Sequence, residues 1–277
     1  MKQININGKL YKDTSAGVPY DSRAVRFGFG LYETMLVLDG RIQLLQHHFD
    51  RLFAGIEQLK LIKPELMTRE WIEEEIMRTV KKNQLEKLCR VRFQVYAGKG
   101  GLFDGQSQWT EFIIDCQEID RDLIQLNEKG LTWIYAEGLA KSPDSIANLK
   151  STNAMIYALG ARQAIENNVD NTIIVNTYGN AIETTLANIF CIKGDVLYTP
   201  PLSEGCVAGV MRRFVMEQLP SKGFTIKEEV FTRDFLKSAD SVFATNAIRR
   251  LKWVSQIEDK QYPIGKILDV YENISYV

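Results

Sequence analysis

Apolar positions along the first part of the chain change their spacing several times, and each change predicts an element. Residues 32–45 hold two apolar runs around an Asp-Gly pair, which favours a two-residue hairpin turn. Apolar residues then recur at helical spacing in residues 49–59 and 68–80. Residues 88–96 alternate between apolar and polar positions, which predicts a half-buried strand. The pattern therefore predicts strands combined with two helices.

A polar and charged stretch separates this part from a second block of strands and helices. The second block contains helices predicted near residues 153–167 and 209–219. Its predicted strands are residues 131–136, 172–176, 188–192, 196–198, 224–230, 241–245 and 251–257. Two mixed blocks predict two α/β or α+β domains. We expect a smaller N-terminal domain in residues 1–116, a linker in 117–129 and a larger C-terminal domain in 130–277.

Composition narrows the classes of partner. The chain has 277 residues, of which 45% are hydrophobic and 25% charged, and its formal net charge is −1. This length allows a substantial core. The near-zero charge lacks the basic excess that nucleic acids or anionic membranes attract. No apolar run is long enough to span a bilayer. We therefore expect a small-molecule ligand, and neither a nucleic acid nor a membrane.

Cysteine and histidine are too scattered to predict a metal site or a disulfide framework. The four cysteines are Cys89, Cys116, Cys191 and Cys206. Their spacing is typical of a reducing cytosol. His47 and His48 are the two histidines, and they are adjacent, which disfavours a multi-histidine metal site. Residues 1–8 alternate like a strand and lack the apolar core of a signal peptide. We expect a cytoplasmic protein.

Three segments together suit pyridoxal phosphate. Lys150 follows apolar Leu149 and precedes a small polar run and a predicted helix, so its amine can be partly desolvated and nucleophilic. Glu183 follows a turn and precedes a strand. Residues 205–212 form a glycine-bounded turn that leads into an apolar helix, whose first N–H groups suit a phosphate. The amine can bind the cofactor's aldehyde, and the carboxylate can bind its ring nitrogen.

Arg51 and Thr245 extend this set. Arg51 lies on the first predicted helix and can bind a phosphate with two parallel hydrogen bonds. Thr245 ends a predicted strand and can donate its hydroxyl. Taken singly, each residue has a more ordinary interpretation: a surface lysine, a surface arginine, a turn carboxylate, a strand-end cap. Their combination, not any one of them, favours the cofactor.

These segments resemble the class-IV pyridoxal-phosphate enzymes (fold type IV), which include branched-chain and D-amino-acid aminotransferases and 4-amino-4-deoxychorismate lyase. The similarity extends over nearly the whole chain, and order and spacing carry it. The matching segments are residues 26–34, 48–52, 148–153, 183–190, 199–200, 205–212 and 245–246.

The resemblance implies a two-domain α/β (α+β) fold of the D-amino-acid-aminotransferase type. It implies pyridoxal 5'-phosphate in the interdomain cleft, and a homodimer whose partner contributes to each site. Lys150 would be the Schiff-base lysine, and Glu183 the partner of the ring nitrogen. The residues implied to hold the phosphate are Arg51, Val210, Met211 and Thr245.

The chain departs from its relatives in the loop that binds the substrate carboxylate. Aminotransferases of this family commonly carry Arg-Gly where this chain has Ala97 and Gly98. Leu102 stands where the lyases place a substrate-binding arginine. The usual arginine is therefore missing from this loop. The candidates to replace it are Lys99, Arg249 and Arg26.

Other positions divide between a lyase and an aminotransferase. Thr34 matches a threonine that the lyases use beside the cofactor, and Met211 stands where aminotransferases more often have threonine. Met155 replaces a tyrosine that branched-chain enzymes place near the cofactor's phenolic oxygen. Tyr32 instead matches a residue of the substrate pocket in D-amino-acid aminotransferases.

Three functions remain open from the sequence. The first hypothesis is 4-amino-4-deoxychorismate lyase, which releases 4-aminobenzoate and pyruvate for folate synthesis, with Lys150 as base and Thr34 assisting proton delivery. The second is an aminotransferase for D-amino or branched-chain acids, in which Lys150 performs a 1,3-proton shift. The third is a non-catalytic binding protein that kept the scaffold. Pyruvate release without a keto-acid acceptor distinguishes the first from the second.

Overall fold

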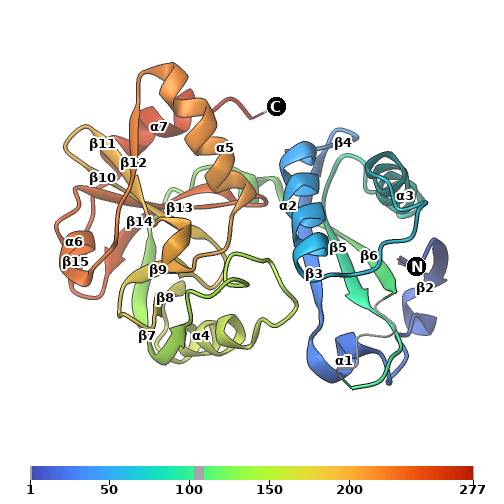
Figure 1. The fold of residues 1–277 in the computed structure, drawn as a ribbon. Coiled ribbons are helices and arrows are strands. Elements are labelled where there is room, and N and C mark those ends of the chain that lie inside the picture. The colour runs from blue at the N-terminus through green and yellow to red at the C-terminus, as the bar shows by residue number, and fades with distance from the viewer. Residues whose placement is uncertain (1, 103–108, 277) are drawn as a thin grey trace. The chain divides into compact units, whose positions relative to one another are not determined.

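The structure is a computed structural model that describes residues 2–102 and 109–276. The chain divides into two compact units, each built on its own sheet (Figure 1). The first unit contains Met1–Arg121 together with the short segment Leu149–Asn153, and the second contains Asp122–Asn148 and Ala154–Val277. The chain passes from the first unit to the second between Arg121 and Asp122, inside the predicted linker, and the segment that carries Lys150 packs with the first unit.

The sheet of the first unit is antiparallel and runs in the order β2-β1-β6-β5-β3-β4. Its strands are β1 (Gln3–Ile6), β2 (Lys9–Lys12), β3 (Gly30–Leu38), β4 (Arg41–Ile42), β5 (Leu88–Ala97) and β6 (Thr110–Glu118). β3 and β4 form the hairpin that the Asp-Gly pair predicted. β4 ends earlier than expected, since a helix begins at Leu45.

One face of this sheet is covered by helices and the other carries polar side chains. Helices α2 (Leu45–Gln58) and α3 (Arg69–Lys82) pack on the apolar face, where Met35 and Phe93 are fully buried (Figure 1). Strand residues alternate between the two faces. The alternate residues Tyr32 and Thr34 of β3, with their cross-strand partners on β5, therefore lie on the opposite face.

The segment Leu149–Asn153 runs beside the start of β3. The backbone N–H of Tyr32 donates to the carbonyl of Lys150 at 3.0 Å, and that of Thr152 donates to the carbonyl of Gly30 at 2.9 Å. A Cβ on Gly30 would lie 2.6 Å from the Val95 carbonyl oxygen, so this close strand approach requires glycine. These bonds hold the backbone of Lys150 against the first sheet.

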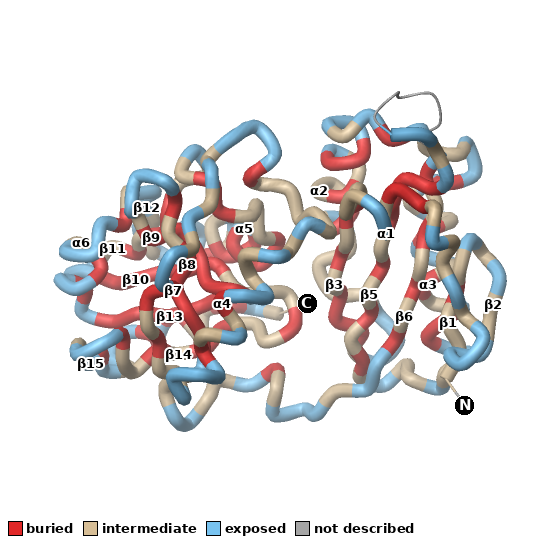
Figure 2. Tube along the Cα trace, turned by 90° about the horizontal axis from the view of Figure 1, so that it is seen from below, coloured by how far each residue is buried: buried red, intermediate tan, exposed pale blue. Residues whose placement is uncertain are grey.

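The sheet of the second unit is mixed and runs in the order β12-β11-β10-β13-β14-β7-β8-β9, with β15 paired to β14. Its strands are β7 (Leu131–Lys141), β8 (Asn171–Asn176), β9 (Ala181–Thr184), β10 (Asn188–Lys193), β11 (Val196–Thr199), β12 (Thr225–Glu228), β13 (Ser241–Asn246), β14 (Arg250–Ile257) and β15 (Lys260–Gln261). Buried positions concentrate along β8, β10 and β13, whereas β12 at the edge is largely exposed (Figure 2).

Helices of the second unit pack on this sheet. α4 (Met155–Glu166) lies against β7 and β8, and α5 (Val210–Gln218) lies against β13. The remaining α-helices are α1 (Arg23–Phe27) in the first unit, and α6 (Arg233–Lys237) and α7 (Ile267–Asn273) in the second. In the described part of the chain, no helix has both the length and the apolar composition needed to span a bilayer.

The predicted mixed α/β fold is confirmed, and the differences are informative. β9 was not predicted, and Glu183 lies inside it rather than in a turn. The Asn176 side chain accepts the backbone N–H groups of Tyr178 and Asn180, both at 3.0 Å, and so turns the chain tightly enough for β9 to pair with β8. A strand of four residues is too short to show a recognisable alternation of apolar and polar positions. β9 forms because it pairs with β8, which the sequence pattern does not report.

Candidate functional site

Lys150 lies beside an aromatic ring and an arginine of the first unit. Its Nζ is 4.6 Å from the centre of the Tyr32 ring, and the Cζ of Arg92 is 3.8 Å from the same centre. A cation near the ring face is attracted by the ring's quadrupole. Lys150 is half-buried. We name Lys150, Tyr32, Thr34 and Arg92 the amine cluster.

Arg92 is the member of this cluster that sequence reasoning missed. It lies directly opposite Thr34 in the pairing of β3 with β5, so both side chains are on the polar face. Its Nε and a terminal nitrogen donate to Oε1 of Gln94 at 3.3 and 3.0 Å, which orients the guanidinium. Burial lowers the pKa of Arg92, and Tyr32 opposes this effect. The alternation of residues 88–96 places Arg92 on the polar face of a strand but does not indicate which residues it contacts.

Arg51, predicted to hold phosphate, is engaged by a buried carboxylate. Its Nε donates to Oε1 of Glu33 at 2.8 Å, and a terminal nitrogen donates to Oε2 at 2.5 Å. Nδ1 of His48 lies 2.6 Å from the same Oε2. Burial alone would raise the pKa of Glu33, but the Arg51 charge and the His48 hydrogen bond outweigh it and hold this pKa at about 2. Burial lowers the pKa of His48.

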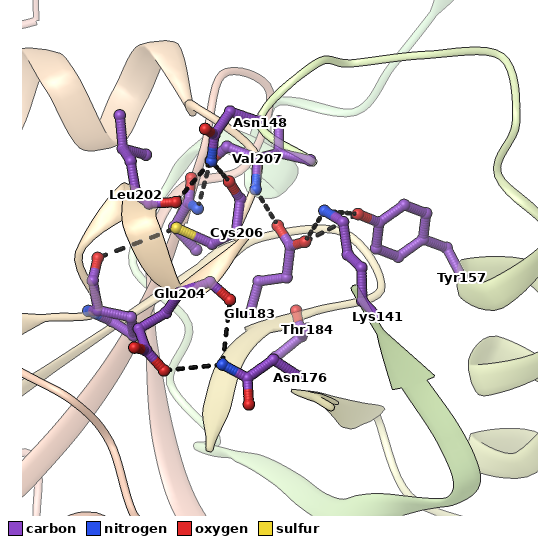
Figure 3. A network of polar contacts seen from close by, with 12 residues as sticks. Lys141, Asn148, Tyr157, Asn176, Glu183, Thr184, Leu202, Glu204, Cys206 and Val207 are labelled. Carbon is purple, nitrogen blue, oxygen red and sulfur yellow. Dashed lines mark hydrogen bonds and ion pairs between the residues drawn. The ribbon is translucent and has the colours of Figure 1, made fainter. Parts of the chain in front are cut away.

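Glu183 is the centre of a hydrogen-bond network in the second unit (Figure 3). Its Oε1 accepts from Lys141 Nζ at 2.8 Å and from the Tyr157 hydroxyl at 2.7 Å. Its Oε2 accepts the backbone N–H of Val207 at 2.9 Å. Only 4% of its side chain is exposed. We name Glu183, Lys141, Tyr157 and Val207 the carboxylate network.

The start of α5 follows Val207 of this network closely in sequence and presents backbone N–H groups that have no partner inside the helix. α5 begins at Val210, followed by Met211, and Gly209 before it has no capping side-chain bond. A Cβ on Gly209 would lie 1.8 Å from Oδ1 of Asn188, so a side chain there would have to displace the Asn188 amide, which donates to the Val207 carbonyl at 2.9 Å. We name residues 209–211, Asn188 and Thr245 the helix cradle.

Thr245 supplies an independent sign of a ligand in this cradle. It pairs with Asn188 in the register of β10 and β13. Its side-chain hydroxyl is buried without a hydrogen-bond partner. A buried unsatisfied hydroxyl is costly, and a phosphate oxygen at the cradle would accept its hydrogen bond. A helix N-terminus with an unpaired hydroxyl is a donor set that fits the phosphate of pyridoxal phosphate.

The loop between β11 and α5 is held from several sides. The side-chain amide of Asn148 donates to the carbonyls of Leu202 and Cys206 at 2.8 and 2.7 Å. Arg212 donates to the carbonyl of Pro200 at 2.9 Å. The Glu204 carboxylate accepts from Asn176 and Asn180 (Figure 3 shows the Asn176 contact). The amide of Val207 and the start of α5 are therefore fixed without a ligand.

The other predicted substrate-binding residues lie in different units. Lys99 belongs to the first unit, where its Nζ lies 3.7 Å from Asp21 and 66% of its side chain is exposed. Arg249 is half-buried in the turn between β13 and β14 of the second unit. Leu102 and Met155 are largely exposed. Within the residues that the structure describes, no group of three or more His, Cys, Asp or Glu side chains could hold a metal.

Known proteins of three named activities resemble this chain. The aminodeoxychorismate lyase of Vibrio harveyi is 26% identical over 257 residues, which cover 90% of this chain and 92% of that protein. The D-alanine aminotransferase of Staphylococcus epidermidis is 23% identical over 280 residues, covering 96% and 93%. The crystal structure of a branched-chain aminotransferase from Thermoproteus uzoniensis matches with a TM-score of 0.89 at 22% identity, covering 98% of this chain and 92% of that one.

The solved structure shows that the fold is shared. The relatives are named for three different activities, so their names do not decide which reaction this chain catalyses. A model of the family described as amino-transferase class IV matches residues 30–257, which is most of the chain. The matched region includes the amine cluster, the carboxylate network and the helix cradle. The chain therefore belongs to the class-IV aminotransferase family and is a pyridoxal-phosphate-dependent enzyme.

Proposed function

We propose that this class-IV enzyme is a 4-amino-4-deoxychorismate lyase, which converts its substrate to 4-aminobenzoate and pyruvate. The observation that carries the proposal is the Thr34 side chain on the sheet face where the half-buried Lys150 amine and Arg92 lie against the Tyr32 ring. An amine that can act as a base and a fixed guanidinium together suit an anionic amino substrate. Thr34, opposite Arg92 in the sheet, adds a hydroxyl on the same face.

We assign the cofactor contacts residue by residue. Lys150 would bind the aldehyde covalently, and Glu183 would bind the ring nitrogen. The phosphate would be held by Arg51, Val210, Met211 and Thr245. When bound, pyridoxal phosphate supplies an electron-withdrawing ring that stabilises negative charge on the carbon next to the substrate nitrogen. The fit is supported by the donor set of the helix cradle and by the orphaned Thr245 hydroxyl.

The protein's own groups would move the protons. The Nζ of Lys150 would take the proton from the ring carbon that bears the substrate's amino group. The Thr34 hydroxyl assists proton delivery to the departing enolpyruvyl group. Arg92 binds a substrate carboxylate, and so replaces the arginine that is missing near Ala97. Its bonds to Gln94 hold the guanidinium in place before the substrate arrives.

An aminotransferase is the second candidate, and Tyr32 favours it. The ring contacts Lys150 directly, as a substrate-pocket residue would. The same Lys150 would then perform a 1,3-proton shift on a D-amino or branched-chain acid. Met155 supports the lyase instead, because it is largely exposed and carries no hydroxyl where branched-chain enzymes have a tyrosine.

A substrate panel tests the choice. The purified holoenzyme is given aminodeoxychorismate without a keto acid, and separately D-alanine or L-leucine with 2-oxoglutarate. Pyruvate released stoichiometrically with 4-aminobenzoate is the expected result. Amino transfer to 2-oxoglutarate, with no pyruvate from aminodeoxychorismate, would overturn the proposal. Thr34→Ala should lower pyruvate release more than it lowers cofactor affinity, and Thr34→Ser should restore it.

We also propose that the enzyme is a cytoplasmic homodimer in folate synthesis. The similarity to an aminodeoxychorismate lyase supports the folate role. Sedimentation at several protein concentrations measures the dimer. A deletion strain that grows normally without 4-aminobenzoate, in a cell with no second lyase, would argue against the folate role.

A further inference from the structure

The carboxylate network contains two side chains that the proposed function does not use. Lys141 stands at the end of β7, and Tyr157 lies near the start of α4. Both point toward Glu183, and the Lys141 Nζ also donates to the Tyr157 hydroxyl at 2.7 Å (Figure 3). Lys141 is 42 residues from Glu183 in sequence and Tyr157 is 26 residues away, so only the fold brings them together.

The network divides the two oxygens of Glu183 unequally. Oε1 accepts two strong bonds, from an ammonium and from a hydroxyl, which use its acceptor capacity. Oε2 accepts one backbone N–H from Val207, so by lone-pair count it can accept one more hydrogen bond. The carboxylate is therefore oriented, with Oε2 as the oxygen that can receive a ligand.

The network also compensates the charge of a buried anion. The Glu183 side chain is 4% exposed and that of Lys141 is 14% exposed. A carboxylate removed from water is costly unless a cation or several donors balance it. The Lys141 ammonium at 2.8 Å supplies this balance.

We propose that Lys141 and Tyr157 are positioning residues that balance the charge of the Glu183 carboxylate, fix its orientation and leave its Oε2 to accept from the cofactor's protonated ring nitrogen. The inference rests on the proposed role of Glu183. In this proposal the two residues have different roles. Lys141 balances the negative charge of Glu183, and Tyr157 fixes the orientation of Oε1. Neither residue contacts the substrate or exchanges a proton with it.

The test measures pyridoxal-phosphate affinity of the apoprotein by absorbance titration between pH 5 and 9. Lys141→Met should weaken binding by at least about tenfold, because truncating one partner of a buried charge pair is expensive. Lys141→Arg should restore most of the affinity. Tyr157→Phe, which keeps the cation, should weaken binding less, by about threefold.

The pH profile separates positioning from a merely structural effect. Without the ammonium at 2.8 Å, the buried Glu183 carboxylate lacks its cationic partner. The affinity of Lys141→Met should therefore differ most from that of the wild type at the acidic end of this pH range. Lys237→Met is the matched control, since Lys237 pairs with Asp259 on the surface, and its side chain is 59% exposed. Its affinity and profile should equal those of the wild type.

A double-mutant cycle keeps the test decisive if single variants are unstable. Adding Lys141→Met to Glu183→Gln should cost less than about threefold in affinity, because the charge partner is already gone. An equal loss in both backgrounds would overturn the inference. So would a folded Lys141→Met protein with wild-type affinity and pH profile while Glu183→Gln binds weakly. If Glu183→Gln itself binds normally, the proposed role of Glu183 fails as well.

Discussion

The two units contribute groups of very different construction. In the second unit, Glu183 already has three hydrogen-bond donors, and the α5 terminus is fixed by a loop with its own internal bonds. In the first unit, Lys150 and Arg92 lie against a ring on the open polar face of a sheet. One group is buried and prearranged, and the other is partly exposed.

This difference assigns separate tasks to the units. A rigid, satisfied donor set binds a constant ligand well, because little ordering is needed on binding. A half-exposed cation and amine on a sheet face can meet different substrates with few backbone changes. We infer that the second unit binds the cofactor's ring nitrogen and phosphate with prearranged groups, whereas the first unit, which also supplies Lys150 and Arg51, determines the reaction and its substrate.

The largest expected effect comes from the reactive amine. Lys150→Ala should lower turnover by more than about a thousandfold, since it removes both the covalent attachment and the base. The fold should persist, because the lysine's backbone bonds do not need its side chain. Steady-state rates and circular dichroism measure this. Lys81→Ala, an exposed lysine at the end of α3, is the control and should behave as wild type.

Arg51→Ala should lower the free energy of unfolding as well as cofactor affinity. The stability loss is expected because Arg51 pairs with the buried Glu33 carboxylate within the first unit. The difference between the ordinary pKa of 4.5 and the value of about 2 for Glu33 corresponds to on the order of 3 kcal/mol. Because this pKa is depressed in the folded protein, the contribution is present above pH 4.5 and is lost as the pH falls toward 2.

Urea unfolding at pH 7 and pH 3 measures that prediction. The gap in unfolding free energy between wild type and Arg51→Ala should shrink at the lower pH. Arg162→Ala removes an exposed ion pair on α4 and should cost at most about 0.5 kcal/mol. A gap that is the same at both pH values would mean that the Glu33 charge is not its source.

Gly209→Ala tests whether the helix cradle of the second unit is rigidly prearranged. The new Cβ would meet Asn188 Oδ1 at 1.8 Å, so either the start of α5 or the Asn188 side chain, together with its bond to Val207, must shift. Cofactor affinity should fall by about tenfold, with a stability loss of about 1–3 kcal/mol from overpacking. Gly17→Ala has nothing within 4 Å of its Cβ and is the control. Unchanged affinity in Gly209→Ala would show that the cradle tolerates movement.

Arg92→Gln should separate substrate binding from cofactor binding. It removes one charge-assisted hydrogen bond to a substrate carboxylate, so KM should rise by about tenfold while cofactor affinity stays constant. Arg90→Gln, two residues earlier on the same face and bonded to Gln117, is the matched control. If cofactor affinity falls together with KM, the assignment of tasks to the two units is wrong.

The sequence by itself determined the elements and the family. Spacing of apolar residues predicted the hairpin, helices α2 and α3 of the first unit and most strands, because one buried face imposes a local period. Ordered short motifs identified the residues proposed to bind pyridoxal phosphate. These signals are local, so they name candidate groups without naming the partners of those groups.

Only the tertiary structure decided which groups meet. Pairing of β3 with β5 brought Arg92 opposite Thr34, and the bonds of residues 149–153 to β3 joined Lys150 to the first unit. Lys141 reaches Glu183 across 42 residues of chain. Periodicity reports whether a position is buried, but a hydrogen bond or ion pair depends on the distance between segments, which strand order and helix packing set.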